Sequence, residues 1–410
     1  MPPRGLRVGV AFGGRSVEHD VSIITGLQAL AVLEERHSPV PIYIARSGRW
    51  FTGDALRDLA TYQSGGSGGD GGGDLSGLNG GDPDADEVHF DLHNGRLLRA
   101  GDGGGSLLRR RSAPEPIELD VVVLATHGTQ GEDGCLAGAF ELARLPYAGP
   151  SVGAAAAAMD KVTTKAVLAQ AGLPALDHLA FRREQWEREG ASIAARARQR
   201  LSLPLYVKPA SLGSSVGVSR CESEEEVAQA LELVFELDRV CLIEPAVEGG
   251  VEVNCSVLGR PGGEPRASVC EQPVAAEGFL SFEDKYMRDG SPKGMKGAAR
   301  LIPAPLQDAV TERIQDLAKR AFVAFGCAGV TRVDFLIDAS GNPYVNELNT
   351  IPGSFSFYLW EPSGLPFVDL MDELLDLALA EQRETQRTTT VFDTSLLALR
   401  ASGAKAGEKA

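Results

Sequence analysis

Several features that define other classes of protein are missing from this sequence of 410 residues. No uninterrupted apolar run approaches the roughly 20 residues that a membrane-spanning helix needs, and the first residues, 1–7, lack the apolar core of a secretory signal. The six cysteines are scattered without a C-x-x-C pair, so we expect buried free thiols and neither a disulfide framework nor a zinc site. These absences favour a cytoplasmic protein with no membrane partner.

Positive charge is also scarce, since 40 Lys and Arg residues face 56 Asp and Glu residues. A net charge of −16 disfavours a nucleic-acid partner, although a local basic pocket for phosphates is compatible with it. The sequence contains no convincing Ser-His-Asp or Cys-His grouping, so we expect no protein nucleophile.

The length predicts more than one domain, and alternating strand and helix patterns predict the α/β class. The segment 62–116 is rich in Gly and Asp and is expected to be largely disordered, with a short hairpin around 88–98. We expect an N-terminal α/β domain at 1–150, two further subdomains at 151–248 and 249–383, and a polar tail at 384–410.

Regular elements are predicted on either side of that segment by hydrophobic periodicity. The expected strands are 6–12, 41–45, 119–126, 205–209, 240–244, 252–258, 330–337 and 343–349. The expected helices are 22–36, 135–145, 160–171, 222–236, 306–325 and 367–381.

A Gly/Ser loop follows a predicted strand that ends in Lys208, in the stretch KPASLGSSVG. Glycines allow backbone N–H groups to close over phosphate oxygens, and a lysine supplies a point charge. The loop is not a Walker motif, because its lysine precedes the glycines. Read alone, it could equally be a plain turn between two strands.

Polar residues interrupt the two apolar strands VTRVDFLID and YVNELN. The two-residue period of a strand places Arg332 with Asp334, and Glu347 with Asn349, on common faces. Two carboxylates and an amide oxygen suit Mg²⁺ held together with substrate phosphates. The alternative is a surface hairpin with alternating polar positions, but charges inside apolar strands need a reason.

Two Gly-rich turns of the first domain each follow a strand and precede a helix, namely GGRSVE at 13–18 and HGTQGEDG at 127–134. In open α/β sheets that edge binds ligands. Glu18, His127, Glu132 and Asp133 therefore favour a polar substrate pocket, although a lone His127 would more often be structural. Neither turn has the G-x-G-x-x-G spacing of a dinucleotide site.

Taken together, the segments GGRSVEHDVS, HGTQGEDG, MDKVTTK, VKPASLGSSVG, TRVDF and NELNTIPGS resemble the D-alanine–D-alanine ligases of the ATP-grasp superfamily. The resemblance covers most of the chain outside 62–116 and the tail. It implies a three-domain ligase that binds ATP between its central and C-terminal domains. The implied activity is ligation of two D-alanines through an acyl phosphate for peptidoglycan synthesis, and the implied assembly is a homodimer.

The resemblance also implies a role for each matching residue. Lys161, Lys208 and Ser215 would contact the ATP phosphates; Glu244, Ala246 and Val247 the adenine; and Glu252 the ribose, although EGGVE is one residue longer than the family's usual G-x-E. Asp334, Glu347 and Asn349 would bind two Mg²⁺ or Mn²⁺ ions. Glu18 and His127 would place the first D-alanine, Arg332 and the N–H of Gly353 would form an oxyanion hole, and Ser214 and Tyr286 would join Glu18 in a hydrogen-bonded triad.

The segment 279–302 is long, broken by Gly and Pro, and basic toward its end. Such a loop suits a mobile lid that closes over phosphates and excludes water from an acyl phosphate, although an ordinary surface loop has the same composition. It contains Lys285 and Tyr286, the pair typical of dipeptide-forming relatives. No histidine occurs between 279 and 302, which disfavours a hydroxy acid as the second substrate.

The sequence departs from the family pattern after Gly353, where it reads SFSFYLW. The family's serine that helps to hold the second substrate's carboxylate becomes Tyr358, and Ser356 is an alternative source of that hydroxyl. A related ligase with a different second amino acid therefore stays open. A non-catalytic nucleotide-binding relative is the other alternative, which the intact Asp334, Glu347 and Lys208 disfavour.

Overall fold

The computed structural model describes residues 5–63, 85–100, 115–190, 192–274, 287–288, 291–292 and 300–391. Most of the expected lid at 279–302, including Lys285 and Tyr286, lies outside these residues, as do most of the Gly-rich segment and the end of the tail. In the described part of the chain, no helix is long and apolar enough to cross a membrane. The α/β class predicted from the sequence is confirmed.

The N-terminal region is built on an eight-stranded sheet in the order β6-β5-β4-β3-β2-β1-β7-β8. Four of its strands are parallel neighbours, and their apolar residues are covered on both faces of the sheet. Helix α1 (His19–Leu33) packs on one face and α3 (Cys135–Leu142) belongs to the core of the other. The strands are β1 (Arg7–Gly13), β2 (Ser38–Ile44), β3 (Trp50–Thr52), β4 (Asp86–Asp91), β5 (Arg96–Arg99), β6 (Ile117–Glu118), β7 (Val121–Leu124) and β8 (Tyr147–Ala148).

The hairpin expected around 88–98 is present as the antiparallel pair β4–β5 and extends this sheet. Val88 and Leu97 are buried, and the ring of Phe90 stacks on Trp50 with centroids 5.8 Å apart. This part of the Gly-rich segment is therefore ordered, because its alternating apolar residues bury surface against the domain.

The central region is a four-stranded antiparallel sheet in the order β11-β10-β12-β9. Its strands are β9 (Leu179–Arg182), β10 (Leu205–Pro209), β11 (Ser219–Cys221) and β12 (Val240–Pro245). Helices α7 (Ser192–Leu201) and α8 (Glu224–Leu237) cover its core, next to the short α6 (Arg183–Glu189). The sequence analysis did not predict α6 and α7, whose many charged residues leave only a narrow apolar face.

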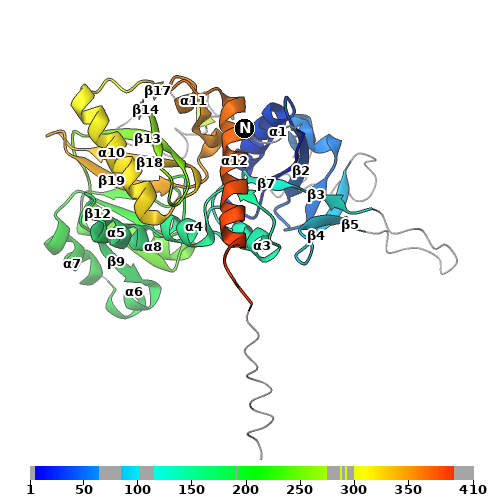
Figure 1. Ribbon diagram of the computed structural model, residues 1–410. Helices are drawn as coiled ribbons and strands as arrows, with labels where there is room; N and C mark the ends of the chain where they lie inside the picture. Colours follow the sequence, from blue (N-terminus) through cyan, green and yellow to red (C-terminus); the bar gives the residue numbers. More distant parts are fainter. Residues whose placement is uncertain are drawn as a thin grey trace, which may run out of the picture.

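The third region is a five-stranded antiparallel sheet in the order β17-β14-β13-β18-β19. Its strands are β13 (Val251–Gly259), β14 (Arg266–Pro273), β17 (Arg300–Leu301), β18 (Gly329–Ile337) and β19 (Pro343–Asn349). One face carries α10 (Asp308–Phe325), drawn in yellow in Figure 1, and packs against α4 (Val152–Met159) and α5 (Lys161–Gln170). Strand β14 was not predicted, because its polar residues obscure the alternation of apolar and polar side chains that indicates a strand.

The last helix, α12 (Phe367–Gln386), joins the third region to the N-terminal sheet (Figure 1). Its buried Leu370, Met371 and Leu374 share one core with Val8 and Val10 of β1. The imidazole Nε2 of His37 also lies 3.0 Å from Asp372 Oδ1 on this helix. The loops at the ends of β1 and β7 are thereby held opposite β18 and β19.

Candidate functional site

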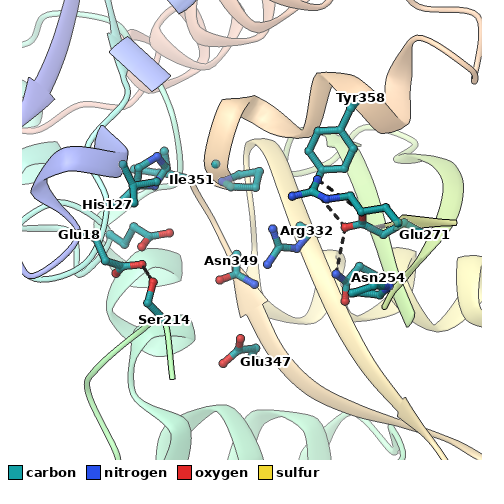
Figure 2. Close-up of a pocket in the computed structure, with 16 residues that line it drawn as sticks. Glu18, His127, Ser214, Asn254, Glu271, Arg332, Glu347, Asn349, Ile351 and Tyr358 are labelled. Carbon is teal, nitrogen blue, oxygen red and sulfur yellow. Dashed lines mark hydrogen bonds and ion pairs between the residues drawn. The ribbon is translucent and has the colours of Figure 1, made fainter. Parts of the chain in front are cut away.

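One cavity lies where the three regions meet, and a second lies between the central and third regions. The first is shown in Figure 2 and is lined by eight of the predicted site residues: Glu18, His127, Ser214, Arg332, Glu347, Asn349, Gly353 and Tyr358. The second is lined by five more: Lys161, Lys208, Ser215, Glu252 and Asp334, and also by Glu347. Glu347 and Asn254 line both cavities, so the two spaces adjoin.

Glu18 lies at the turn between β1 and α1, and the Ser214 hydroxyl donates a hydrogen bond to its Oε1. This bond connects the N-terminal region to the Gly/Ser loop of the central region (Figure 2). Two glycines make the close approach possible. A Cβ at Gly213 would lie 2.7 Å from Glu18 Oε2, and one at Gly128, whose φ is +69°, would lie 2.3 Å from Ser16 Oγ.

His127 lies beside Glu18 in the first cavity and is held by Thr25, whose Oγ1 is 2.8 Å from Nε2. Burial lowers the pKa of His127 to about 4, so the imidazole is neutral near pH 7. The Thr25 hydroxyl also accepts a hydrogen bond of 3.2 Å from the backbone N–H of Ser354. One threonine thus connects the two sides of the cavity.

Glu132 lines the same cavity, and its Oε2 accepts a 2.8 Å hydrogen bond from the N–H of Gly128. Burial, and then the nearby Glu18 carboxylate, raise the pKa of Glu132 to about 8. Near pH 7 this carboxyl group therefore carries a proton. The neighbouring Asp133 instead accepts the N–H groups of Gln130 and Cys135 and stabilises the turn.

Arg332 lies between the two sides of the cavity and binds Asp334 in bidentate geometry, with Nε–Oδ1 at 2.7 Å and Nη2–Oδ2 at 2.8 Å. Asn349 donates from Nδ2 to the same carboxylate at 2.9 Å. Burial opposes the charge of Arg332, but Asp334 outweighs this effect and raises the pKa of Arg332. The site therefore keeps a permanent cation close to Gly353, which lines the same space.

The predicted metal ligands come from directly paired positions on two strands. Asp334 is the partner of Glu347, and Arg332 the partner of Asn349, in the β18–β19 register. Two carboxylates and an amide beside the lysine-lined cavity are the donor types that Mg²⁺ prefers. Across the described residues, no group of three His, Cys, Asp or Glu side chains could hold a metal by itself. The set therefore fits an ion that takes its other ligands from a phosphate or from water.

The second cavity is the more basic one, with Lys161 and Lys208 among its lining residues. Lys161 donates from Nζ to the carbonyl of Leu212 in the Gly/Ser loop at 2.6 Å. Lys208 contacts Glu244, whose other carboxylate oxygen lies 3.0 Å from Nζ of Lys165. Burial would raise the pKa of Glu244, but these two lysines lower it to about 2.

Lys165 is a buried cation that the sequence analysis did not identify, although it ends the stretch MDKVTTK. Its signal was present, because it lies four residues after Lys161 on α5 and so shares a helix face with it. The Glu244 side chain points to the two lysines. Glu244, Ala246 and Val247, predicted to contact adenine, are not among the residues that line the second cavity.

Tyr358 and three residues that the sequence analysis did not identify form the other side of the first cavity. The Tyr358 hydroxyl donates to Glu271 Oε1 at 3.1 Å, and Asn254 Nδ2 donates to the same oxygen at 3.0 Å. The guanidinium of Arg300 lies 4.4 Å from the Tyr358 ring centroid. No motif covers Glu271 or Asn254, and Arg300 lies at the end of the segment 279–302. The carboxylate in the stretch SVCEQP was the available signal.

The segment that follows Gly353 turns sharply before it reaches Tyr358. Ser354, Phe355 and Ser356 have φ angles of 53°, 53° and 51°, which is the left-handed region. Ser356 is fully buried and does not line the cavity, so the structure does not place its hydroxyl where the sequence analysis suggested. Tyr358 is the member of this segment that reaches the cavity wall.

Comparison with known proteins identifies the family of this chain. Family models described as the D-ala D-ala ligase N-terminus and C-terminus match residues 7–150 and 167–376. A D-alanine–D-alanine ligase of Natranaerobius thermophilus is 35% identical over 95% of this chain and 99% of its own length. The solved D-alanine-D-alanine ligase of Coxiella burnetii has a TM-score of 0.74 at 28% identity, covering 98% of this chain and 99% of that one. The VanG D-Ala:D-Ser ligase of Enterococcus faecalis has a TM-score of 0.71 at 26% identity, covering 92% and 100%. The chain therefore belongs to the D-alanine–D-alanine ligase family, with the ATP-grasp fold.

Proposed function

We propose that this protein joins two molecules of D-alanine at the expense of ATP, through an acyl phosphate, and so supplies D-alanyl-D-alanine for peptidoglycan. The observation that carries the proposal is the junction of the two cavities at Glu347 and Asn254. It lets a carboxylate bound between Glu18 and Arg332 meet a phosphate bound by Lys161 and Lys208. Membership of the family supports the same reaction.

In the first step, the ammonium group of the first D-alanine pairs with Glu18, next to the neutral His127. The substrate carboxylate then attacks the γ-phosphate of ATP, and ADP leaves. Lys161 and Lys208 neutralise the phosphates, and the Gly/Ser loop with Ser215 adds donors. Glu252, which lines the same cavity, would accept the ribose hydroxyls. The backbone from Glu244 to Val247, at the end of β12, would receive the adenine edge.

Asp334, Glu347 and Asn349 would hold two Mg²⁺ or Mn²⁺ ions. When bound there, such ions supply positive charge to the transferring phosphoryl group. The bidentate contact with Arg332 and the amide of Asn349 keep the Asp334 carboxylate oriented toward β19.

In the second step, the amine of the second D-alanine attacks the acyl phosphate and phosphate departs. Arg332 and the N–H of Gly353 stabilise the oxyanion of the tetrahedral intermediate, and one well-placed donor contributes about 3–4 kcal/mol. Lys285 would contact substrate and Tyr286 would complete the triad with Ser214 and Glu18; both residues lie outside the described part of the chain. A homodimer is the proposed assembly, which sedimentation of the purified protein tests.

The test is ADP release that depends on D-alanine and on Mg²⁺, with the dipeptide identified by mass spectrometry. Glu347→Gln keeps the size of a predicted metal ligand and removes its charge, so it should lose activity. Glu312→Gln is an exposed control for the same change. Absence of ADP release with every D- and L-amino acid contradicts the proposal.

A second candidate, a ligase with a different second amino acid, is favoured by Tyr358 at the cavity wall. With D-alanine as donor, profiling of other D-amino acids as acceptors distinguishes the two. A single preferred product other than D-alanyl-D-alanine would support the second candidate.

A further inference from the structure

Arg300 differs from the other charged groups of the first cavity because its guanidinium makes few polar contacts. It begins the short strand β17 and is paired with Pro273 of β14, so its backbone is fixed by the sheet. Its side chain is 19% exposed, and its Nη1 lies 3.7 Å from Glu271 Oε2, beyond hydrogen-bonding range. No hydrogen bond joins its guanidinium to any residue that the structure describes, although a guanidinium offers five donors.

The surroundings of Arg300 hold this guanidinium in place. The ring of Tyr358 lies against it at 4.4 Å, a distance that suits a cation–π contact. Glu271 is 2% exposed, and its Oε1 accepts hydrogen bonds from Tyr358 and Asn254. Its Oε2 is buried without a hydrogen-bond partner in the described structure. Glu271 is thus fixed from one side and supplies the negative charge that keeps Arg300 at the cavity wall.

The other groups of the cavity cannot serve an incoming anion equally well. Arg332, the other guanidinium that lines the cavity, already uses Nε and Nη2 on Asp334. The Tyr358 hydroxyl is engaged by Glu271. The remaining titratable side chains of the lining are Glu18, Glu132, Glu347 and the neutral His127, none of which carries a positive charge.

We propose that Arg300 binds the carboxylate of the second, acceptor amino acid, with Glu271 and Tyr358 as the residues that position it. This inference rests on the proposed ligase function. It assigns the acceptor's recognition to a guanidinium and not to the hydroxyl of Tyr358 or Ser356. The ring of Tyr358 forms a wall of the same space, which favours an acceptor with a small side chain, of the size of alanine or serine.

The test compares two acceptors that differ in one charge, D-alanine and D-alaninamide, with D-alanine as donor. The readout is the ratio of their kcat/KM values as acceptors, from dipeptide and dipeptide amide quantified by mass spectrometry. In the unaltered protein we expect D-alanine to be preferred. In Arg300→Gln the ratio should fall about 10- to 100-fold, as expected for loss of a charge-assisted hydrogen bond. Arg300→Lys should restore part of it.

Arg266→Gln is the matched control. Arg266 is also on the third sheet and lies over an aromatic ring, that of Trp360, but it is exposed and pairs with Glu373 outside the cavity. In Arg266→Gln, the ratio of kcat/KM for D-alanine to that for D-alaninamide should be unchanged. The assignment of Arg300 is overturned if the ratio is also unchanged in Arg300→Gln, or if the KM for ATP rises while the ratio stays the same. Either result leaves the proposed function standing. If the unaltered protein forms no dipeptide, the proposed function is overturned and this inference falls with it.

Discussion

The two sides of the first cavity are built in different ways. The donor side, formed by Glu18, His127, Glu132 and Ser214, lies on turns whose glycines permit close approach, and burial has moved two of its groups toward their neutral forms. The acceptor side, formed by Glu271, Arg300 and Tyr358, lies mainly on strands and keeps opposite charges near each other. Under the proposed function, the first substrate meets a side shaped by close backbone approach, and the second meets a side built from paired opposite charges.

Arg332 lies between the two sides, and its loss should have the largest effect. Arg332→Gln removes the cation from the proposed oxyanion hole and frees Asp334 from its bidentate partner. We expect kcat to fall by about 100- to 1000-fold, as for loss of one oxyanion donor. Steady-state ADP release measures this, and a melting curve checks that the protein is folded. A kcat within tenfold of the unaltered protein would remove Arg332 from the mechanism.

On the donor side, Glu18→Gln keeps the hydrogen bond with Ser214 but removes the charge that would pair with the substrate ammonium. The KM of the first D-alanine should rise about 10- to 100-fold, while the preference for D-alanine over D-alaninamide as acceptor stays the same. Asp20→Asn is the control, since Asp20 is an exposed carboxylate on the same helix. A change in acceptor preference would show that the two sides are not independent.

On the acceptor side, Tyr358→Phe keeps the ring against Arg300 and removes the hydroxyl that donates to Glu271. The KM of the acceptor should rise by about 3- to 10-fold, the effect of one hydrogen bond. Tyr344→Phe also removes a hydroxyl bound to a carboxylate, that of Asp338, at the far end of β19 and should leave the KM unchanged. A larger effect on the first D-alanine than on the second would contradict the division into two sides.

The last prediction concerns the stability of the folded protein, which should depend on pH. The raised pKa of Glu132 means that the folded protein keeps a proton that the unfolded chain releases near the ordinary glutamate value of 4.5. The stabilisation is complete below about 4.5 and is lost as pH rises to about 8. Glu132→Gln should flatten the fall in melting temperature over this range, and Glu312→Gln should not. Parallel melting curves for both variants would contradict the raised pKa.

The donor side was largely predictable from the sequence because short segments fix its geometry. Glu18 and His127 lie at the ends of predicted strands, and strands β1 and β7 are neighbours in the sheet, so the two turns had to meet. Glycines at 128 and 213 mark the places where the backbone approaches Glu18. Asp334 and Glu347 lie on the predicted strands 330–337 and 343–349, which follow one another closely in the sequence and pair directly.

The acceptor side was not predictable, because it depends on contacts between strands that are distant in the sequence. Glu271 meets Asn254 through the β13–β14 register and Arg300 through β14–β17, and β14 itself was not recognised. Tyr358 was identified only as a departure from the family pattern. Its hydroxyl is directed to a buried carboxylate that no short motif contains.

The three left-handed residues after Gly353 have an evolutionary consequence. A non-glycine residue in this conformation costs roughly 1–2 kcal/mol, and here three such residues follow one another, tied to Thr25 through the N–H of Ser354. Exchange of Tyr358 alone for a relative's residue would leave a new side chain on a backbone shaped for the old one. Transfer of a relative's side chain at Tyr358 should therefore require the whole block from Gly353 to Trp360, together with the Glu271 and Arg300 that contact it.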